Sequence, residues 1–376
     1  MTARATYQAR SRFAVAAIAC LFLGACGSLR YYGQAVHGQA DLLARRRPVR
    51  SVISDPATAP QLAARLQLAL QARQFAVQQL GLPDTRSYTS FVALDRPFVV
   101  WNVFATPRYS VDALRHCFPI AGCVGYRGWF SQAAAQADAN RLQARGADVW
   151  VAGVTAYSTL GWFADPILSS MLDGDEDALS GTIFHELAHQ LVYAKQDTAF
   201  NESYATFVQT EGLRQWRRAR GLPPQNGRVQ RWRDGFTGLV LDLRKRLAAL
   251  YASGVDDAAM AAGKRAEITA FRTRYGHWQQ CEHVPAARFA GWLAQPINNA
   301  RLLPFGLYDG WMPAFAQLYR HSEGSWPAFH ASVRALARKP RVARTRALQA
   351  LMGTVDENVQ IACGNSSCIP GANRCP

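Results

Sequence analysis

The chain has 376 residues and a formal net charge of +16 at pH 7. Hydrophobic residues make up 49% of it and charged residues 18%, which excludes a disordered or low-complexity protein, because such chains carry too little apolar surface to build a core. The length suits one large or two ordinary domains, and the positive charge favours an anionic partner.

An export signal is predicted at residues 1–25. Three arginines precede the apolar run Phe13–Leu23, which is too short to span a bilayer comfortably. Small residues then lead to Cys26. This order resembles a bacterial lipobox, which implies cleavage before Cys26 and attachment of lipid to that cysteine. The alternative is an ordinary signal peptide that happens to contain a cysteine.

The residue after Cys26 and the charge of the mature chain bear on location and partners. Gly27 rather than an aspartate follows Cys26, and the lipobox resemblance then implies the outer membrane, facing the periplasm. Loss of three leader arginines lowers the net charge from +16 to +13 (16 minus 3). We expect attraction to anionic lipid or to the acidic cell envelope, although an arginine-rich chain without a partner would have the same composition. Export argues against a nucleic-acid partner, and the oligomeric state is left open.

The exported chain keeps further cysteines in a compartment that permits disulfides. Cys117 and Cys123 flank a turn with proline and glycine, so this pair is predicted to form a disulfide. The pairing of the others stays open: Cys281, Cys363, Cys368 and Cys375. The last three could instead form a metal knuckle, but an oxidising envelope favours disulfides.

Hydrophobic periodicity and turn residues predict the order of helices and strands. Two helices, at residues 29–47 and 61–80, come first and form a hairpin near the anchor. Strands follow at Tyr88–Leu94, Pro97–Thr106, Val124–Phe130 and Asp148–Ala156, with a helix at Ser131–Arg145 before the last strand. One helix ending near Tyr193 and another at residues 202–220 come next, and the remaining chain is mainly helical.

The most informative stretch is an HExxH array at residues 185–189. On a helix, positions four apart share a face, so His185 and His189 can bind one metal ion while Glu186 lies beside them as a general base. Glu202 is the first glutamate after the array and is expected to start the next helix. Two imidazoles, one carboxylate and an open fourth position make a catalytic zinc site. The alternative is two core histidines and a glutamate at a helix start.

Both motifs have relatives among known peptidases. HELAHQ at residues 185–190, followed by FNESYATF at residues 200–207, resembles the gluzincin metallopeptidases, whose second motif reads NExxA or NExxS. The spacing departs from that pattern, because the 12 residues between His189 and Glu202 are fewer than in the thermolysin-like or large aminopeptidase groups. Most of the mature chain is similar to a bacterial family of lipoprotein aminopeptidases, through Tyr31–Ala35, Cys117–Pro119, Gly122–Val124, Tyr126–Gly128, Ala156–Phe163, the metal stretch and Asn298–Ala300.

The resemblance implies a zincin-like α+β fold with a small N-terminal sheet, a metal-binding helix pair and a mainly helical C-terminal half. The predicted parts are the leader at 1–25, a helical hairpin at 26–86, a sheet with zinc-binding helices at 87–222, a helical half at 223–362 and a Cys-rich tail at 363–376.

The resemblance also implies the roles of single residues. His185, His189 and Glu202 would bind Zn²⁺, and Glu186 would take a proton from water and hand it to the leaving amine of a peptide substrate. Gluzincins stabilise the oxyanion with a tyrosine or histidine, and Tyr157 and Tyr308 are candidates here. The strand Asp148–Ala156 lies where such enzymes bind extended peptide by strand addition.

The kind of peptidase and two alternatives of other classes remain open. The resemblance favours an aminopeptidase over an endopeptidase. The large zinc aminopeptidases, however, bind the substrate amine with a glutamate before the metal helix, and this chain has no glutamate before Glu176. Asp165, Asp309 or a later glutamate would have to replace it. One alternative is a non-catalytic envelope lipoprotein with a structural zinc or a peptide-binding, chaperone-like role. A cell-wall amidase is less well matched, because amidases do not usually carry HExxH.

Overall fold

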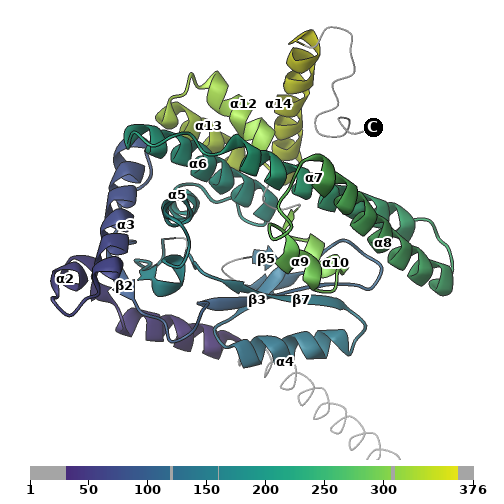
Figure 1. The fold of residues 1–376 in the computed structure, drawn as a ribbon, viewed down its shortest axis with the longest axis horizontal. Coiled ribbons are helices and arrows are strands. Elements are labelled where there is room, and N and C mark those ends of the chain that lie inside the picture. The colour runs from purple at the N-terminus through teal and green to yellow at the C-terminus, as the bar shows by residue number, and fades with distance from the viewer. Residues whose placement is uncertain (1–30, 119–121, 160, 306–309, 363–376) are drawn as a thin grey trace, which may run out of the picture.

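The computed structural model describes residues 31–118, 122–159, 161–305 and 310–362, with side chains as far as residue 352. The described part is α+β, with short strands gathered in the first half and helices dominating the second (Figure 1). None of the described helices is long and apolar enough to cross a membrane.

The strands are β1 (Arg47–Pro48), β2 (Ser90–Val92), β3 (Val100–Thr106), β4 (His116–Phe118), β5 (Gly122–Val124), β6 (Tyr126–Trp129), β7 (Asp148–Val154) and β8 (Ile167–Leu168). Residues 31–44 are helical. The other helices are α2 (Val49–Ser54), α3 (Pro60–Gln79), α4 (Gln132–Gln143), the 3-10 turn η1 (Ser169–Met171), α5 (Glu176–Leu191), α6 (Thr198–Ala219), α7 (Gly227–Tyr251), α8 (Asp257–Cys281), α9 (Ala290–Ala294), α10 (Asn299–Leu302), α12 (Met312–His321), α13 (Trp326–Arg338) and α14 (Arg341–Ala362).

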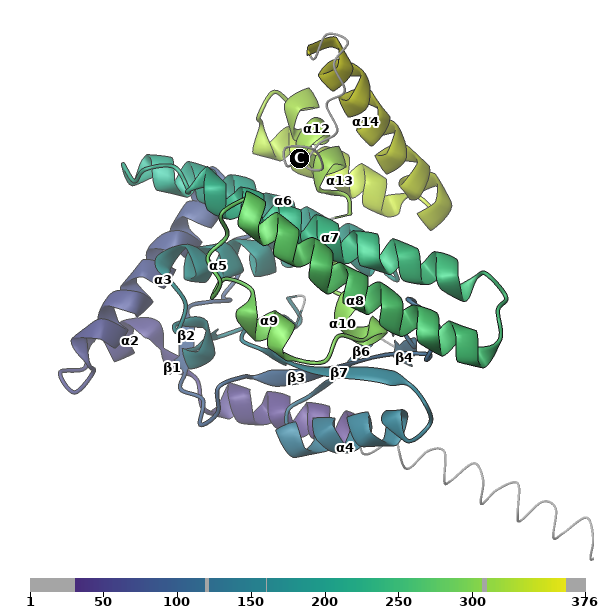
Figure 2. The same ribbon diagram turned by 45° about the vertical axis from the view of Figure 1, so that its right-hand side comes forward.

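The main sheet separates two apolar layers. Its strand order is β6-β3-β7, with antiparallel pairs that run from Val100 opposite Val154 to Thr106 opposite Asp148. Side chains alternate along β3, so Trp101 and Val103 face α4, whereas Phe104 packs with residues of α10. Figures 1 and 2 show α4 on one side of this sheet, and α5 and α10 on the other. The sheet therefore forms a floor beneath α5.

One large core joins both ends of the chain around α5 and α6. It contains residues of α3, α5, α6, α12 and α13, among them the buried aromatic side chains of Phe184, Phe200, Tyr204, Phe315 and Phe329. The long helices α7 and α8 lie side by side (Figure 2) and enclose a separate cluster around Phe236 and Phe271.

Several predicted boundaries differ from the structure. Helix α6 begins at Thr198 and not at Glu202, because Asp197 accepts a hydrogen bond from the Phe200 amide and caps the helix one turn earlier. The strand expected at Tyr88–Leu94 is reduced to β2, since Tyr88 has a φ of 62°. The short elements β1, β8 and α2 were not predicted, because strands of two residues and a helix of six are too short to show a periodic pattern.

A disulfide joins Cys117 in β4 to Cys123 in β5, the pair that the sequence indicates. Cys281 is also disulfide-bonded. Cys363, Cys368 and Cys375, with the lipid site predicted at Cys26, lie outside the described residues.

A buried ion pair holds the last helix against the start of α6. The Arg344 guanidinium donates through Nε to Asp197 Oδ2 at 2.8 Å. It also lies over the ring of Phe200, 5.1 Å from the ring centre. Both side chains are almost fully buried. Because Asp197 also caps α6, this pair fixes the helix that carries Glu202.

Replacement of Arg344 by alanine is expected to lower the free energy of unfolding by about 3–5 kcal/mol, because Asp197 is left as an uncompensated buried charge. Urea denaturation of the two proteins measures the difference. Arg341→Ala, which changes an exposed arginine of the same helix, is the matched control and should cost less than about 0.5 kcal/mol. Equal effects of the two substitutions would contradict the role given to Arg344.

His330 of α13 forms a second buried link. Its Nε2–H donates to the Leu80 carbonyl at 2.8 Å, so Nδ1 accepts from the Tyr204 hydroxyl at 3.0 Å. Burial, together with the nearby charge of Arg334, lowers the pKa of His330 to about 4, against a partial opposing effect of the bond to Leu80. The neutral ring thus joins α3, α6 and α13.

This lowered pKa predicts a loss of stability in acid. The unfolded chain takes up a proton near pH 6.5 and the folded chain only near pH 4, so the contribution is complete above pH 6.5 and disappears between these values. It amounts to about 3 kcal/mol. Denaturation curves between pH 7 and 4 should fall more steeply for the native protein than for His330→Gln. Parallel curves would be inconsistent with a neutral His330.

Candidate metal centre

Helix α5 presents the HExxH residues from a buried scaffold. Asp175 caps the helix by accepting from the Ala178 amide at 2.7 Å, and Glu176 and Asp177 place negative charge at the positive end of its dipole. The apolar face, with Ile183, Phe184, Leu187 and Ala188 buried, fixes the rotation of the helix. His185, Glu186 and His189 are therefore held in register by packing.

A turn held by Asn201 brings Glu202 to α5. The Asn201 side chain accepts from the Ala194 amide at 2.7 Å and donates to the Ala194 carbonyl at 2.9 Å. It is 1% exposed. This double contact folds the loop after α5 back on itself, so the asparagine of the Asn-Glu motif positions the turn while its neighbour reaches the histidines.

Close packing of α5 on α6 completes the approach. A Cβ atom at Gly212 of α6 would lie 2.7 Å from Leu80 Cδ1 and 3.1 Å from Phe184 Cδ2. A Cβ atom at Gly181 of α5 would lie 2.9 Å from Leu213 Cδ1. Glycine at these two positions allows the helix axes to come close enough for one carboxylate of α6 to meet two imidazoles of α5.

Three atoms converge at the centre. His185 Nε2 lies 3.1 Å from His189 Nε2 and 3.3 Å from Glu202 Oε2, and His189 Nε2 lies 3.6 Å from the same oxygen. A tetrahedral zinc with ordinary bonds of 2.0–2.1 Å to nitrogen requires ligand atoms about 3.3 Å apart. The observed separations fit that requirement, so these residues can hold a zinc ion.

A hydrogen bond at Nδ1 orients the His185 ring for metal binding through Nε2. His185 Nδ1 lies 3.1 Å from Gln209 Oε1. If Nδ1 carries the proton and donates to this oxygen, Nε2 keeps its lone pair for a metal. Two acids of the α6 segment are engaged elsewhere, Asp197 with Arg344 and Glu211 with Arg214.

The pKa values of Glu202 and His189 are both shifted at this site. Burial alone would raise the pKa of Glu202, but the two histidines outweigh it and hold the pKa well below its ordinary value. Burial would lower the pKa of His189, and the charges of Glu202 and Glu186 outweigh it in the other direction. The site therefore favours positive charge between these buried side chains. A divalent cation would supply that charge.

The charge of Glu186 acts on a group of residues that sequence reasoning did not bring together. Burial, then the charge of Glu186, raises the pKa of the Tyr88 hydroxyl. This hydroxyl is buried without a hydrogen-bond partner among the described residues, and the backbone of Tyr88 is left-handed. Burial, followed by Glu202 and then more weakly by Glu186, also raises the pKa of Tyr126 in β6. The positive φ of an aromatic residue cannot be recognised from sequence alone.

Asp165 is fully engaged within the protein. It accepts from Thr159 through both the amide and the hydroxyl, the latter at 2.7 Å, and lies within 3.4 Å of Gln190 Nε2. Its side chain is buried, and burial, with a smaller effect of Glu186, raises its pKa to about 6. These contacts leave little room for the substrate amine that the sequence analysis assigned to it. The other aspartate considered, Asp309, lies outside the described residues.

Of the two tyrosines predicted to stabilise an oxyanion, the structure describes Tyr157 and does not describe Tyr308. Tyr157 packs edge-on against Phe130, with ring centres 5.6 Å apart, and burial, followed by the charge of Asp165, raises its pKa. No described contact joins it to the three converging residues. Tyr308 lies outside the described residues.

Comparison with protein families adds one finding. Residues 30–348 match the family model described as putative aminopeptidase. The chain belongs to this family. Its description suggests a peptidase and leaves the metal unnamed. A search of curated proteins and a search of solved structures each found no match.

The contact between Gln209 and His185 can be tested by zinc affinity. Gln209→Ala should weaken zinc binding about 10–100-fold, because the imidazole loses the acceptor that fixes its tautomer. Competition with a chromophoric chelator measures this change. Gln230→Ala alters an exposed glutamine of α7 and should bind zinc as the native protein does. Native affinity in the Gln209 variant would refute this role for the side chain.

Proposed function

We propose that this protein is a zinc-dependent peptide hydrolase, and specifically an aminopeptidase, as its family description suggests. The observation that carries the proposal is the convergence of His185 Nε2, His189 Nε2 and Glu202 Oε2 at ligand spacing, with Glu186 on the same helix.

The ligand set supports a catalytic rather than a structural zinc. Structural zinc sites are closed by four protein ligands, whereas catalytic sites use three and keep one position open. Among the described residues, the potential ligands that converge here are His185, His189 and Glu202. This favours hydrolysis over the alternative of a non-catalytic lipoprotein with a structural metal.

The protein's own residues divide the work of peptide cleavage. When bound, Zn²⁺ supplies a Lewis acid that makes water more acidic and polarises a carbonyl group. Glu186 takes the proton from the attacking water and passes it to the leaving amine. His185, His189 and Glu202 remain in place throughout, because α5 and α6 are buried and Gln209 orients one of the rings.

A tyrosine is proposed to stabilise the oxyanion. Tyr157 and Tyr308 were the candidates from sequence, and Tyr126 joins them. Its neutral hydroxyl can donate a hydrogen bond. Burial, followed by the charge of Glu202 and more weakly of Glu186, raises the pKa of Tyr126, whereas the charge acting on Tyr157 is that of Asp165. This proximity to the predicted ligand Glu202 favours Tyr126.

Extended substrate is proposed to pair with the edge of β7. This strand lies at the edge of its sheet, and Asn298 Nδ2 donates to the Val149 carbonyl at 2.9 Å. Since backbone groups alternate in direction along a strand, the N–H and C=O groups of Val151 and Gly153 point away from β3, as the Val149 carbonyl does. Asn298 already bonds to the Val149 carbonyl, so a peptide would bind nearer the C-terminal end of β7.

The location is proposed from the sequence. Lipid on Cys26 would anchor the enzyme in the outer membrane, facing the periplasm, where envelope peptides are accessible. The charge of the chain is compatible with this environment.

The assignment of Glu186 has a direct test. Glu186→Gln should bind zinc as before and lose about 10²–10⁴-fold in kcat, because the amide cannot accept the proton from water. Glu176→Gln removes an exposed acid from the first turn of the same helix and should keep kcat. Full peptidase activity in a zinc-loaded Glu186→Gln protein would sink the mechanism.

The aminopeptidase assignment needs a comparison of substrates. Purified protein should cleave peptides with a free N-terminus and spare the same peptides after N-acetylation, and chelation of zinc should abolish the cleavage. Equal cleavage of acetylated peptides would instead establish an endopeptidase. A zinc-loaded protein that cleaves neither set would favour the non-catalytic alternative.

A further inference from the structure

Exposed apolar side chains gather along one part of the surface. Among the described residues, two of the large ones lie on helix 31–44, Tyr32 at 39% exposure and Val36 at 69%. Two more lie in the loop before β8, Trp162 at 69% and Phe163 at 47%. The remaining two lie in the second half, Val255 in the loop between α7 and α8 and Val342 on α14.

These side chains follow one helix face that leads to the loop before β8. Tyr32, Val36 and Leu43 are spaced by four and seven residues and therefore share a face of helix 31–44. Leu43 in turn lines a cavity of about 580 Å³ together with Trp162 and Phe163. We call these five residues the apolar stripe. It extends from the first turn of the described chain to the loop beside the metal helix.

The end of the stripe carries positive charge. Arg46 and Arg86 line the same cavity, and its described lining contains no carboxylate. Arg46 donates to the Leu43 and Ala164 carbonyls rather than to an acid. The cavity thus joins two guanidinium groups with two exposed aromatic rings, a combination that suits an anionic group attached to an apolar chain.

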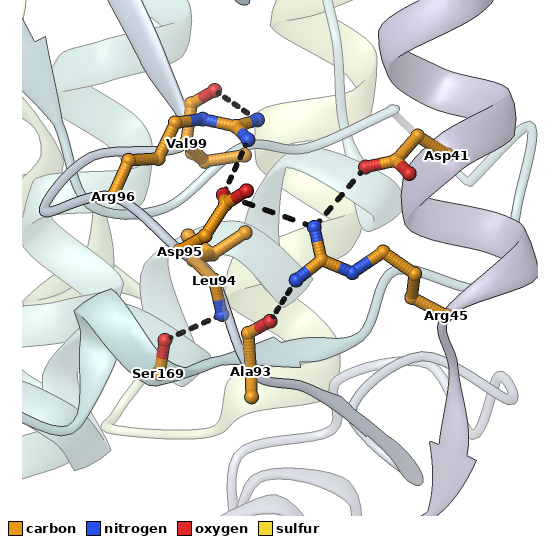
Figure 3. A network of polar contacts seen from close by, with 8 residues as sticks. All are labelled: Asp41, Arg45, Ala93, Leu94, Asp95, Arg96, Val99 and Ser169. Carbon is orange, nitrogen blue, oxygen red and sulfur yellow. Dashed lines mark hydrogen bonds and ion pairs between the residues drawn. The ribbon is translucent and has the colours of Figure 1, made fainter.

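Helix 31–44 is fixed to the protein by its opposite side. Figure 3 shows the Arg45 guanidinium at the end of this helix bonded to Asp41, to the Ala93 carbonyl and to Asp95. Near the middle, a Cβ atom at Gly38 would overlap the ring of Phe130. The helix therefore cannot turn its apolar residues inward.

Hydrogen bonds also fix the shape of the loop that carries Trp162 and Phe163. The Phe163 amide donates to Thr159 Oγ1 at 3.0 Å, and that hydroxyl donates to Asp165 at 2.7 Å. Asp165 is in turn within 3.4 Å of Gln190 Nε2, next to His189 in the metal helix. Trp162 and Phe163 are thus displayed by a structured turn that is connected to α5.

We propose that the apolar stripe, with Arg46 and Arg86, docks on the surface of an anionic phospholipid bilayer. Trp162 and Phe163 enter the headgroup region, and the two arginines meet lipid phosphates. The sequence favours this occupant, because Cys26, the predicted lipid site, lies only five residues before Tyr31. An extended segment of that length reaches at most about 18 Å. The inference concerns orientation at the membrane and does not depend on peptidase activity.

Vesicle sedimentation tests the proposal without the lipid anchor. The chain from Gly27 onward lacks the leader and Cys26 but keeps every described residue and hence the whole core. It should sediment with vesicles of phosphatidylethanolamine and phosphatidylglycerol, and weakly with phosphatidylcholine alone. Replacing Trp162 and Phe163 together by alanine should lower the partition coefficient by about tenfold or more. Arg46→Gln and Arg86→Gln should each lower it about fivefold, on the anionic vesicles only.

Val342→Ala is the matched control, since it removes an equally exposed apolar side chain away from the stripe and should leave partitioning unchanged. Thermal unfolding of each variant checks that the fold is intact. Native partitioning in the Trp162 and Phe163 double variant overturns the proposal. It also fails if that variant changes the oligomeric state but not vesicle binding, because the stripe would then be a contact between copies of the chain.

Discussion

The contact on which the site depends is the packing of α5 against α6. Two imidazoles and a carboxylate within 3.6 Å of one another are unfavourable to bury unless positive charge lies between them. Only helices that approach closely can hold them there, and Gly181 and Gly212 leave the space for that approach. The Asn201 turn and the cap at Asp197 set where α6 begins, and therefore which of its side chains reaches His185.

The remainder of the structure can be understood as support for this pair of helices. The core around Phe184 and Tyr204 fixes their rotation, and the links through His330 and Arg344 attach the C-terminal helices to α6. The β6-β3-β7 sheet forms the floor on the other side (Figures 1 and 2). A metal site requires ligands that are held rigidly, and also rigid residues that hydrogen-bond to those ligands. Small displacements of the ligands change the affinity for the metal and the activity.

The residues around Glu186 extend the site beyond its ligands. Tyr88, Asp165 and Tyr126 come from three separate segments, yet each is affected by the charge of Glu186. Asp165 is linked both to the metal helix through Gln190 and to the turn that displays Trp162 and Phe163. If Trp162 and Phe163 contact the membrane as proposed, Asp165 would connect this surface to α5 through hydrogen bonds.

The order of the main helices and strands, the α+β class and the set of His185, His189 and Glu202 can be predicted from the amino-acid sequence. Those features are local: helical periodicity, capping residues and the four-residue spacing of the array can be read without knowing the fold. The sequence-based prediction misplaced the start of α6 by one turn and did not find Gln209, Tyr88 or Tyr126 at the site. Those positions became apparent in the folded structure. They depend on close helix packing, on a left-handed backbone at Tyr88 and on strand register, which are set by contacts between segments far apart in the chain.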